Sequence, residues 1–333
     1  QGVLLATPAV AVRLEVDLLV ADSVNHQIKG IRLSDGSIHV VAGTGSQLRE
    51  RSGGGPALEQ ALSTPWDLAW LGDRLVIAMA GTHQLWAWTP GDTFADGRVQ
   101  VIGGTSNEGL VDGPARQAWF AQPSGLAASA SGDRIWVADS ETSALRSVTT
   151  TPDGDLVVET HVGTGLFDFG HRDGDARDAL LQHPLGVTEL PDGSVAVSDT
   201  YNGASWVDAV IQRVDGAGRP TFTWDSKGKV NPAEAFVSPN GDYAHINSVQ
   251  LLTNGDILAS FRNLGQVMRI ATTAHDAFAV STVRLPRLNR PITLVPTPLT
   301  ASRSSRVATR CESLVCAPLS VPSGLSPKLP STL

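Results

Sequence analysis

Short apolar runs recur along the chain at nearly constant spacing. They are Leu18–Ser23, Leu75–Ala80, Ile135–Ser140, Val195–Thr200 and a weaker run, Ile257–Arg262. The fifth residues of these runs are Asp22, Met79, Asp139, Asp199 and Phe261, which are 57, 60, 60 and 62 residues apart. This regularity predicts a repeated structural unit of about sixty residues.

Each unit carries the signals of four short strands. A Pro-x-(Gly or Asp)-(Leu or Val) start at Pro65, Pro123 and Pro184 leads through a Gly-Asp or Asp-Gly turn into the apolar run. A third and a fourth strand then follow, at 27–32 and 38–42, at 84–88 and 99–103, and at 144–148 and 157–162. Strands of about five residues joined by two-residue turns with Gly or Asp are typical of antiparallel hairpins. The unit is therefore predicted to be a four-stranded meander.

A further shared segment separates the units. Small and apolar residues recur three and four positions apart in residues 55–62, 112–120 and 173–181. This spacing indicates one short helical turn that packs on the edge of a sheet.

These units favour one architecture. A single four-stranded sheet cannot bury both faces, and its edges invite aggregation, so such sheets stack radially. The sequence therefore predicts an all-β protein, a β-propeller of four-stranded antiparallel blades, with four to five blades present. Residues 1–3 match the middle of a strand start. We therefore expect the chain to begin inside a unit and to form an incomplete ring or part of a six-bladed parent.

The sequence pattern of the repeat resembles that of the NHL repeat. The resemblance is carried by Val20–Ile28 and Asp199–Asn202, and by the inter-blade segments at 107–113 and 170–174. Residues 1 to about 204 are most similar to the propeller of thioredoxin-like NHL-repeat proteins. In that family the propeller follows a thioredoxin-fold module with a Cys-x-x-Cys type site. This chain has no such module, so the resemblance implies a fragment.

Residues from about 205 to 270 resemble bacterial arylsulfotransferases, which are also propellers. The similar stretches are 206–212, 242–248 and 254–263. The resemblance implies that His245 and Arg262 are catalytic residues that hold a sulfuryl group on the central axis. The transfer also needs a nucleophilic His, and no residue matches that motif; His275 does not. Because the sequence pattern changes after about residue 204, we favour a chimeric or misassembled gene over a divergent last blade.

Charge is unevenly distributed. The whole chain carries a formal net charge of −8. Residues 278–333 contain seven basic residues and one acidic residue, a net +6, so the first 277 residues carry −14. An acidic body of this size repels polyphosphate, which disfavours nucleic-acid binding. We expect residues 1–270 to form the propeller (1–204 NHL-like, 205–270 arylsulfotransferase-like), and 271–333 to be a basic, Pro- and Ser-rich tail that is largely disordered.

Membrane, redox and metal chemistry find little support in the sequence. The apolar runs are far shorter than the roughly 20 residues of a membrane helix, and no secretory signal is visible, so a cytoplasmic location is favoured. Both cysteines, Cys311 and Cys316, lie in the tail at a spacing that fits neither a redox pair nor a zinc site. We expect no cofactor, no metal and no membrane partner.

Two recurring sets of polar residues have a structural and a functional interpretation. In the functional interpretation, Asp22, Asp139 and Asp199 form a ring of metal ligands around the central pore. In the structural one, which is more common for an Asp after an apolar strand, each accepts hydrogen bonds from the following turn. His26 and His83 also recur at one position, where the third unit has Ser143. We interpret both sets as structural.

The sequence thus favours a non-catalytic NHL-repeat propeller scaffold that binds a protein or peptide on its loop face. The alternative is a sulfuryl-transferring enzyme, or an inactive remnant of one, that uses His245 and Arg262.

Overall fold

The computed structural model describes residues 2–5, 16–32, 34–170, 172–199, 209–214, 220–231, 233, 243–244, 246–252, 255–264, 266–272, 282–284 and 293–295. Residues 1–297 make one compact unit, and residues 298–333 are assigned to a second. The fold and the sites described below all belong to the first unit.

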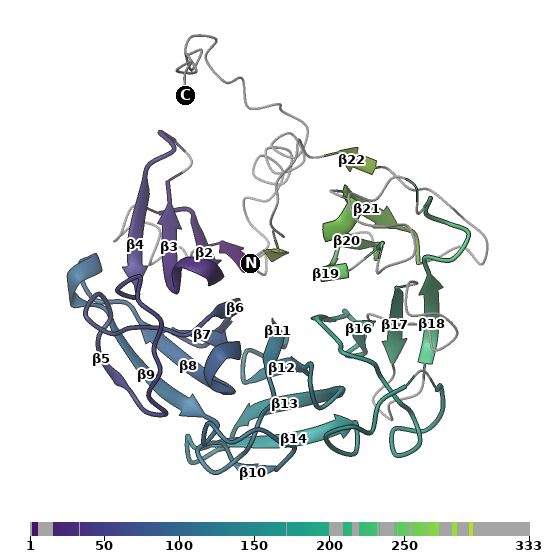
Figure 1. Cartoon of the computed structure of the whole chain (residues 1–333), viewed down its shortest axis with the longest axis horizontal. Coiled ribbons are helices and arrows are strands. Elements are labelled where there is room, and N and C mark those ends of the chain that lie inside the picture. The colour runs from purple at the N-terminus through teal and green to yellow at the C-terminus, as the bar shows by residue number, and fades with distance from the viewer. Residues whose placement is uncertain are drawn as a thin grey trace, which may run out of the picture. The chain divides into compact units, whose positions relative to one another are not determined.

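Five small antiparallel sheets are arranged as the blades of a β-propeller (Figure 1). The first blade contains β1 (Gly2–Leu5), β2 (Leu18–Asp22), β3 (Gln27–Ile31) and β4 (Ile38–Ala42). The second contains β6 (Pro65–Leu71), β7 (Arg74–Met79), β8 (Gln84–Thr89) and β9 (Arg98–Gly103). The third contains β11 (Pro123–Ala128), β12 (Arg134–Asp139), β13 (Ala144–Thr150) and β14 (Leu156–Val162). The predicted all-β propeller of four-stranded meanders is confirmed.

The last two blades follow the same order. The fourth contains β15 (Gly186–Glu189), β16 (Val195–Asp199), β17 (Val210–Val214) and β18 (Pro220–Asp225). The fifth contains β19 (Ile246–Leu251), β20 (Ile257–Phe261), β21 (Gln266–Ile270) and β22 (Thr282–Arg284). Four 3₁₀ turns have described bounds: η1 (Ser23–Asn25), η2 (Ala80–Thr82), η3 (Phe94–Asp96) and η5 (Arg262–Leu264). None of these turns has the length or apolar character of a membrane-crossing helix.

The segment between units differs in part from its prediction. It does contain single helical turns, closed by bonds from the Gln60 amide to the Pro56 carbonyl and from the Ala118 amide to the Pro114 carbonyl. Each turn is preceded by a short strand that the sequence analysis missed, β5 (Gly54–Pro56) or β10 (Gly113–Pro114). β5 pairs with β9 and β10 with β14, so the second and third blades have a fifth strand at the outer edge.

The core lies in the seams between blades. Strand β8 shows how one strand serves two seams, because its side chains alternate between the two faces of the sheet. Trp86 and Trp88 pack with residues of the first blade such as Leu19, whereas Leu85 and Ala87 pack with the third blade. Further apolar clusters join the third blade to the fourth and the fourth to the fifth.

Inner strands of successive blades pass very close to one another. A Cβ on Gly125 of β11 would lie 2.5 Å from the carbonyl oxygen of Leu185 and 3.0 Å from the Cα of Gly186 in β15. Only a glycine fits this approach. In β6 the equivalent position is Asp67, so the seam between the second and third blades has room for a side chain there.

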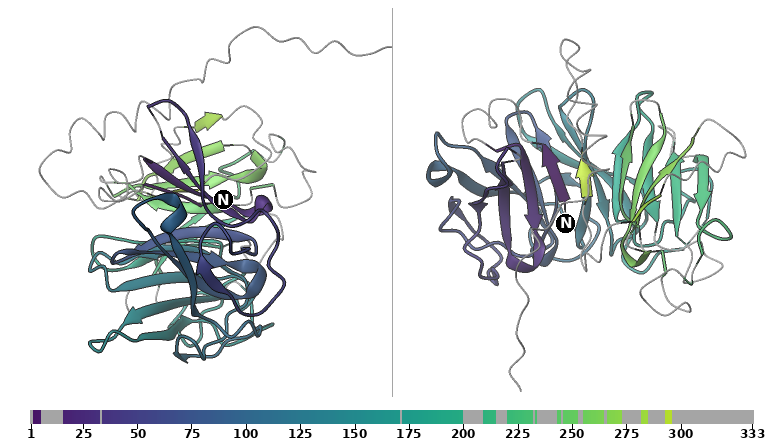
Figure 2. Two further views of the ribbon diagram at one scale, coloured as in Figure 1. Left: turned by 90° about the vertical axis from the view of Figure 1, so that its left-hand side faces the viewer. Right: turned by 90° about the horizontal axis from the view of Figure 1, so that it is seen from above.

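A last strand connects the two ends of the propeller. β23 (Thr293–Val295) pairs in parallel with β1, with Gly2 opposite Thr293, and it also contacts β19 of the fifth blade (Figure 2). Strands β22 and β23 both fall within residues 271–333, the segment expected to be largely disordered. Most of the remaining segment lies outside the described residues, so the expected disorder of this segment stays a prediction.

Candidate functional site

The catalytic pair suggested by the sequence is not placed by the structure. His245 lies outside the described residues, and Arg262 is described only by its backbone, at the start of η5 directly after β20. The pair therefore stays a prediction.

Two of the recurring aspartates, Asp22 and Asp139, belong to ion pairs, and the side chain of Asp199 lies outside the described residues. Asp139 and Arg146 are both fully buried, and their side chains are 3.1 Å apart. The second carboxylate oxygen of Asp139 accepts a hydrogen bond of 2.8 Å from the amide of Ala121. Arg146 also pairs with Asp112 at 2.8 Å and donates to the carbonyl oxygens of Trp119 and Val111. Asp22 accepts a hydrogen bond of 2.8 Å from Nδ2 of Asn25 in the turn that follows its strand, whereas Asp139 is bonded to the segment that precedes its blade.

In this network the carboxylates of Asp139 and Asp112 neutralise the buried guanidinium of Arg146. Burial raises the pKa of Asp139 to about 6, against the opposing effect of Arg146, so its carboxyl is ionised at neutral pH. Partial burial also opposes ionisation of Asp112, but hydrogen bonds from Arg146 and Thr160 outweigh it and lower the pKa of Asp112. The shifted pKa values therefore have a structural cause and do not indicate catalysis.

The other blades have different residues at the positions equivalent to Asp139 and Arg146. In the first blade Asp22 pairs with Lys29 at 2.6 Å. In the second, Met79 and Trp86 occupy these two positions, both without exposure. A Cβ on Gly53 would lie 2.7 Å from the Trp86 ring, so the larger partner requires a glycine. In the fourth blade Gln212 donates to Asp173, and in the fifth Phe261 and Met268 are buried.

The recurring histidines connect neighbouring blades. The Nδ1 atom of His26 accepts a hydrogen bond of 3.0 Å from the amide of Thr64, and Nδ1 of His83 accepts one of 3.1 Å from the amide of Gln122. Ser143 continues the series, because its Oγ accepts from the amide of His183 at 3.3 Å. All six residues have positive φ angles. We call these three interactions the latches.

A buried carboxyl lies on an inner strand. Asp67 of β6 accepts a hydrogen bond of 2.9 Å from the amide of Leu126 in β11, which links two blades. Its other oxygen has no partner among the described residues. Burial raises the pKa of Asp67 to about 6, and the amides of Leu126 and Leu68 only partly offset this effect.

An exposed aromatic loop, residues 163–170, follows β14 and lies on the face that bears the latches. Phe167 is 84% exposed and Phe169 is 41% exposed. The ring of Phe169 lies 6.0 Å from that of the latch residue His183, whose Nε2 lies 3.5 Å from a carboxylate oxygen of Glu141. Counted from the Gly-Thr pair that ends each blade, Gln47 and Glu108 stand where Phe167 does. The aromatic side chains are thus particular to this loop.

The sequence analysis missed this loop and the partner of Asp139. The Leu166–Phe169 stretch between Gly165 and Gly170 was a visible signal, because the equivalent loops are polar. Arg146 was visible as well, at the same seven-residue distance from Asp139 that separates Lys29 from Asp22.

Comparisons with known proteins agree with this architecture. The NHL repeat profile matches residues 120–147, which cover most of the inner half of the third blade. A solved structure of a nidogen/laminin complex contains a chain with a TM-score of 0.50, at 10% identity over 83% of this chain and 80% of that chain. That likeness supports the fold alone. The chain is an NHL-repeat β-propeller.

Two curated relatives extend the match through much of the chain. Protein SUPPRESSOR OF QUENCHING 1, chloroplastic, from Arabidopsis thaliana is 33% identical over 240 residues, 67% of this chain and 22% of that protein. NHL repeat-containing protein 2 from Homo sapiens is 37% identical over 210 residues, 56% of this chain and 28% of that protein. The chain thus spans less than a third of the length of these relatives.

The latches predict a measurable effect on stability. His83→Ala removes the acceptor for the Gln122 amide, and we expect the free energy of unfolding to fall by about 1–3 kcal/mol. His83→Ser should retain most of the stability, because Ser143 serves the same function in the third blade. Urea denaturation of the three proteins measures the difference. Equal losses in both variants would show that the latch bond is not the cause.

Asp67 predicts a pH dependence of stability. Its pKa is about 6 in the folded protein and ordinarily 3.8, so its contribution is fully present below about pH 4 and is lost as the pH rises through 6. The loss amounts to about 3 kcal/mol. Asp67→Asn keeps an oxygen for the Leu126 amide but cannot ionise.

The wild type should therefore lose stability relative to Asp67→Asn as the pH rises from 4 to 7. The free energy of unfolding of the variant minus that of the wild type should increase over this range. Asp139 titrates in the same range in both proteins, so its effect cancels. Parallel stability profiles from urea denaturation at several pH values would contradict the prediction.

Proposed function

We propose that this propeller is a non-catalytic scaffold that binds a protein or peptide on the face bearing the aromatic loop 163–170. The observation that carries the proposal is Phe167, which is 84% exposed and has a φ of 72°. A bulky residue at positive φ is disfavoured, and strained residues of this kind concentrate at binding sites. Exposed aromatic side chains are also frequent anchors of protein interfaces.

The surroundings of the loop favour a particular kind of ligand. Asp168 and Asp175 are close to Phe167 in sequence, and Glu141 lies beside His183 near the ring of Phe169. An apolar anchor flanked by Lys or Arg would bury the aromatic rings and complement these carboxylates. The latches support the proposal, since a loop on a rigid frame loses less conformational entropy on binding.

A panel of defined peptides tests the proposal. Fluorescent decapeptides with one Leu, Met or Trp anchor flanked by Lys and Ser would be compared with versions in which Ser replaces the anchor. We expect the anchored peptides to bind, and Phe167→Ser to weaken binding at least tenfold, because burial of a Phe side chain contributes about 2 kcal/mol. Fluorescence anisotropy provides the dissociation constants.

The matched control is Ile38→Ser, which removes another exposed apolar side chain, 60% exposed, from the first blade. This variant should bind like the wild type. Absence of binding by every anchored peptide, or an equal loss in Ile38→Ser, would count against this face as the binding site.

Two finer expectations rest on sequence resemblance. The first is that the chain is part of a longer thioredoxin-like NHL-repeat protein. The second is the sulfuryl-transfer alternative, which depends on His245 and Arg262 and lacks a residue that matches the nucleophile.

An aryl sulfate assay tests the alternative directly. We expect no transfer from p-nitrophenyl sulfate to a phenol acceptor above the buffer rate, because no nucleophilic His is matched. Release of p-nitrophenol would be followed by absorbance. Turnover that disappears in His245→Ala would replace the scaffold with an enzyme.

A further inference from the structure

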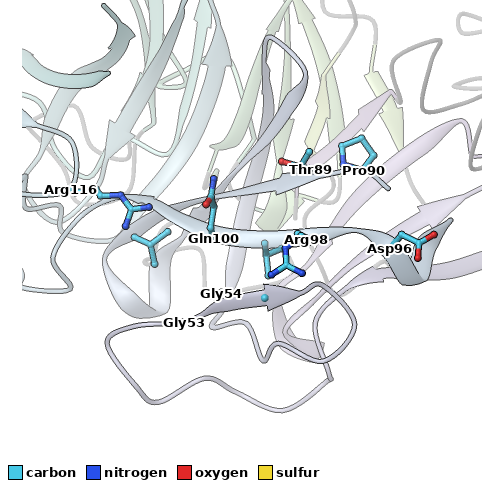
Figure 3. Close-up of a pocket in the computed structure, with 11 residues that line it drawn as sticks. Gly53, Gly54, Thr89, Pro90, Asp96, Arg98, Gln100 and Arg116 are labelled. Atoms are coloured by element: carbon cyan, nitrogen blue, oxygen red, sulfur yellow. The ribbon is translucent and has the colours of Figure 1, made fainter. Parts of the chain in front are cut away.

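A pocket of about 590 Å³ lies at the outer edge of the second blade. One wall consists of Gly53, Gly54 and Gly55, which include the start of β5, and the other consists of residues along β9. Figure 3 shows Arg116, Gln100, Arg98 and Asp96 in one row along the course of β9. The site is distinct from the aromatic loop, which follows β14 of the third blade.

The pocket contains two guanidinium groups that are available to a ligand. Within the described part of the chain, the guanidinium groups of Arg98 and Arg116 have no hydrogen bond or ion pair, and both residues are exposed. The one lining carboxylate, Asp96, is occupied, because its Oδ2 accepts hydrogen bonds from the amide and the hydroxyl of Thr93. The pocket therefore has a local excess of positive charge on a body that carries −14 over its first 277 residues.

The glycine wall presents no side chains to the pocket. Gly55 has no atom within 4 Å of the position that a Cβ would take. The other backbone groups of β5 are largely used within the segment, because the Gly54 amide donates to Oε1 of Gln60 and the Pro56 carbonyl accepts from the amide of Gln60. The wall therefore contributes close approach for an extended chain, because no side chain stands in the way at Gly55.

This combination does not recur in the third blade. β-sheet register places Val157 and Glu159 of β14 where the second blade has Arg98 and Gln100. The counterpart of Arg116 in the next inter-blade segment is Arg177. The corresponding edge of the third blade thus has a carboxylate in place of a neutral side chain and lacks one of the two cations.

We propose that this pocket is a second binding site, which takes an extended acidic peptide segment. Arg98 and Arg116 each present several N–H donors in a planar fork that matches a carboxylate. Their arrangement along β9 fits carboxylates spaced along an extended chain, while Gln100 between them offers a neutral polar contact. The glycine wall accommodates the peptide backbone.

Electrostatic screening decides the conditions of the test. The Debye length is about 8 Å at about 0.15 M ionic strength, so remote carboxylates of the body contribute little there, while direct contacts with the two arginines persist. At low ionic strength the acidic body would repel an acidic peptide. Binding should therefore be measured near 0.15 M NaCl.

The probe is the fluorescein-labelled peptide Gly-Glu-Glu-Gly-Glu-Glu-Gly, with the Gln version of the same peptide as its control. We expect the Glu peptide to bind and the Gln peptide to bind at least tenfold more weakly. Arg98→Gln and Arg116→Gln should each weaken binding of the Glu peptide about tenfold, the loss expected for one charge-assisted contact. Arg177→Gln is the matched control and should bind like the wild type.

Three results would overturn the proposal. These are equal binding by the Arg98→Gln/Arg116→Gln double variant and the wild type, an equal loss in Arg177→Gln, and full displacement of the peptide by inorganic phosphate at about 1 mM and constant ionic strength. The last result would indicate a small-anion site.

Two controls separate a loss of binding from a loss of folding. Both arginines are exposed, so thermal unfolding of the variants should match that of the wild type. A fold defect would also weaken binding at the aromatic loop. Phe167→Ser should leave binding of the Glu peptide unchanged, which separates this proposal from the proposed function.

Discussion

The blades depend on a backbone amide that its own sheet does not satisfy. A residue at positive φ stands just before or near the start of the inner strand in the second, third and fourth blades: Thr64, Gln122 and His183. The amide of each is bonded by a side chain of the preceding blade, namely His26, His83 or Ser143. A buried amide without a partner costs about 1–3 kcal/mol, so this bond fixes where one blade begins relative to the one before it. The apolar clusters of the seams then pack within that spacing.

A second constraint concerns the position at the end of the second strand in each blade. In the four blades where this side chain is described it is buried, so a charge must be matched and an apolar residue must find an apolar partner. Three blades meet this requirement with different pairs at equivalent positions: Asp139 with Arg146, Asp22 with Lys29, and Met79 with Trp86. The partners of Asp22 and Asp139 therefore account for these two aspartates without a metal.

The sequence predicted most of the fold because the second strand of each blade is an apolar run with a constant period and defined turns. It missed β5 and β10, since strands of two or three residues such as Gly113–Pro114 have no periodicity to detect. The site was less predictable. The latch residues were found as a repeat, but their partners lie 38 to 40 residues away, a distance that local patterns do not report. The acceptor role of Asp67 depends on the approach of two inner strands, which also becomes visible only in three dimensions.

The contacts of Arg146 define which stretch of chain forms one structural repeat. Its acceptors are Asp139 in its own blade and Asp112, Trp119 and Val111 in the segment that precedes that blade, and Gln212 reaches back in the same way to Asp173. A cassette for lengthening, shortening or recombining such a ring would therefore run from about 111 to 171, with the inter-blade segment included, and not from proline to proline. Cut in that frame, the cassette would keep Arg146 together with both of its carboxylate partners, and the latches would join it to any neighbour that offers a free main-chain amide.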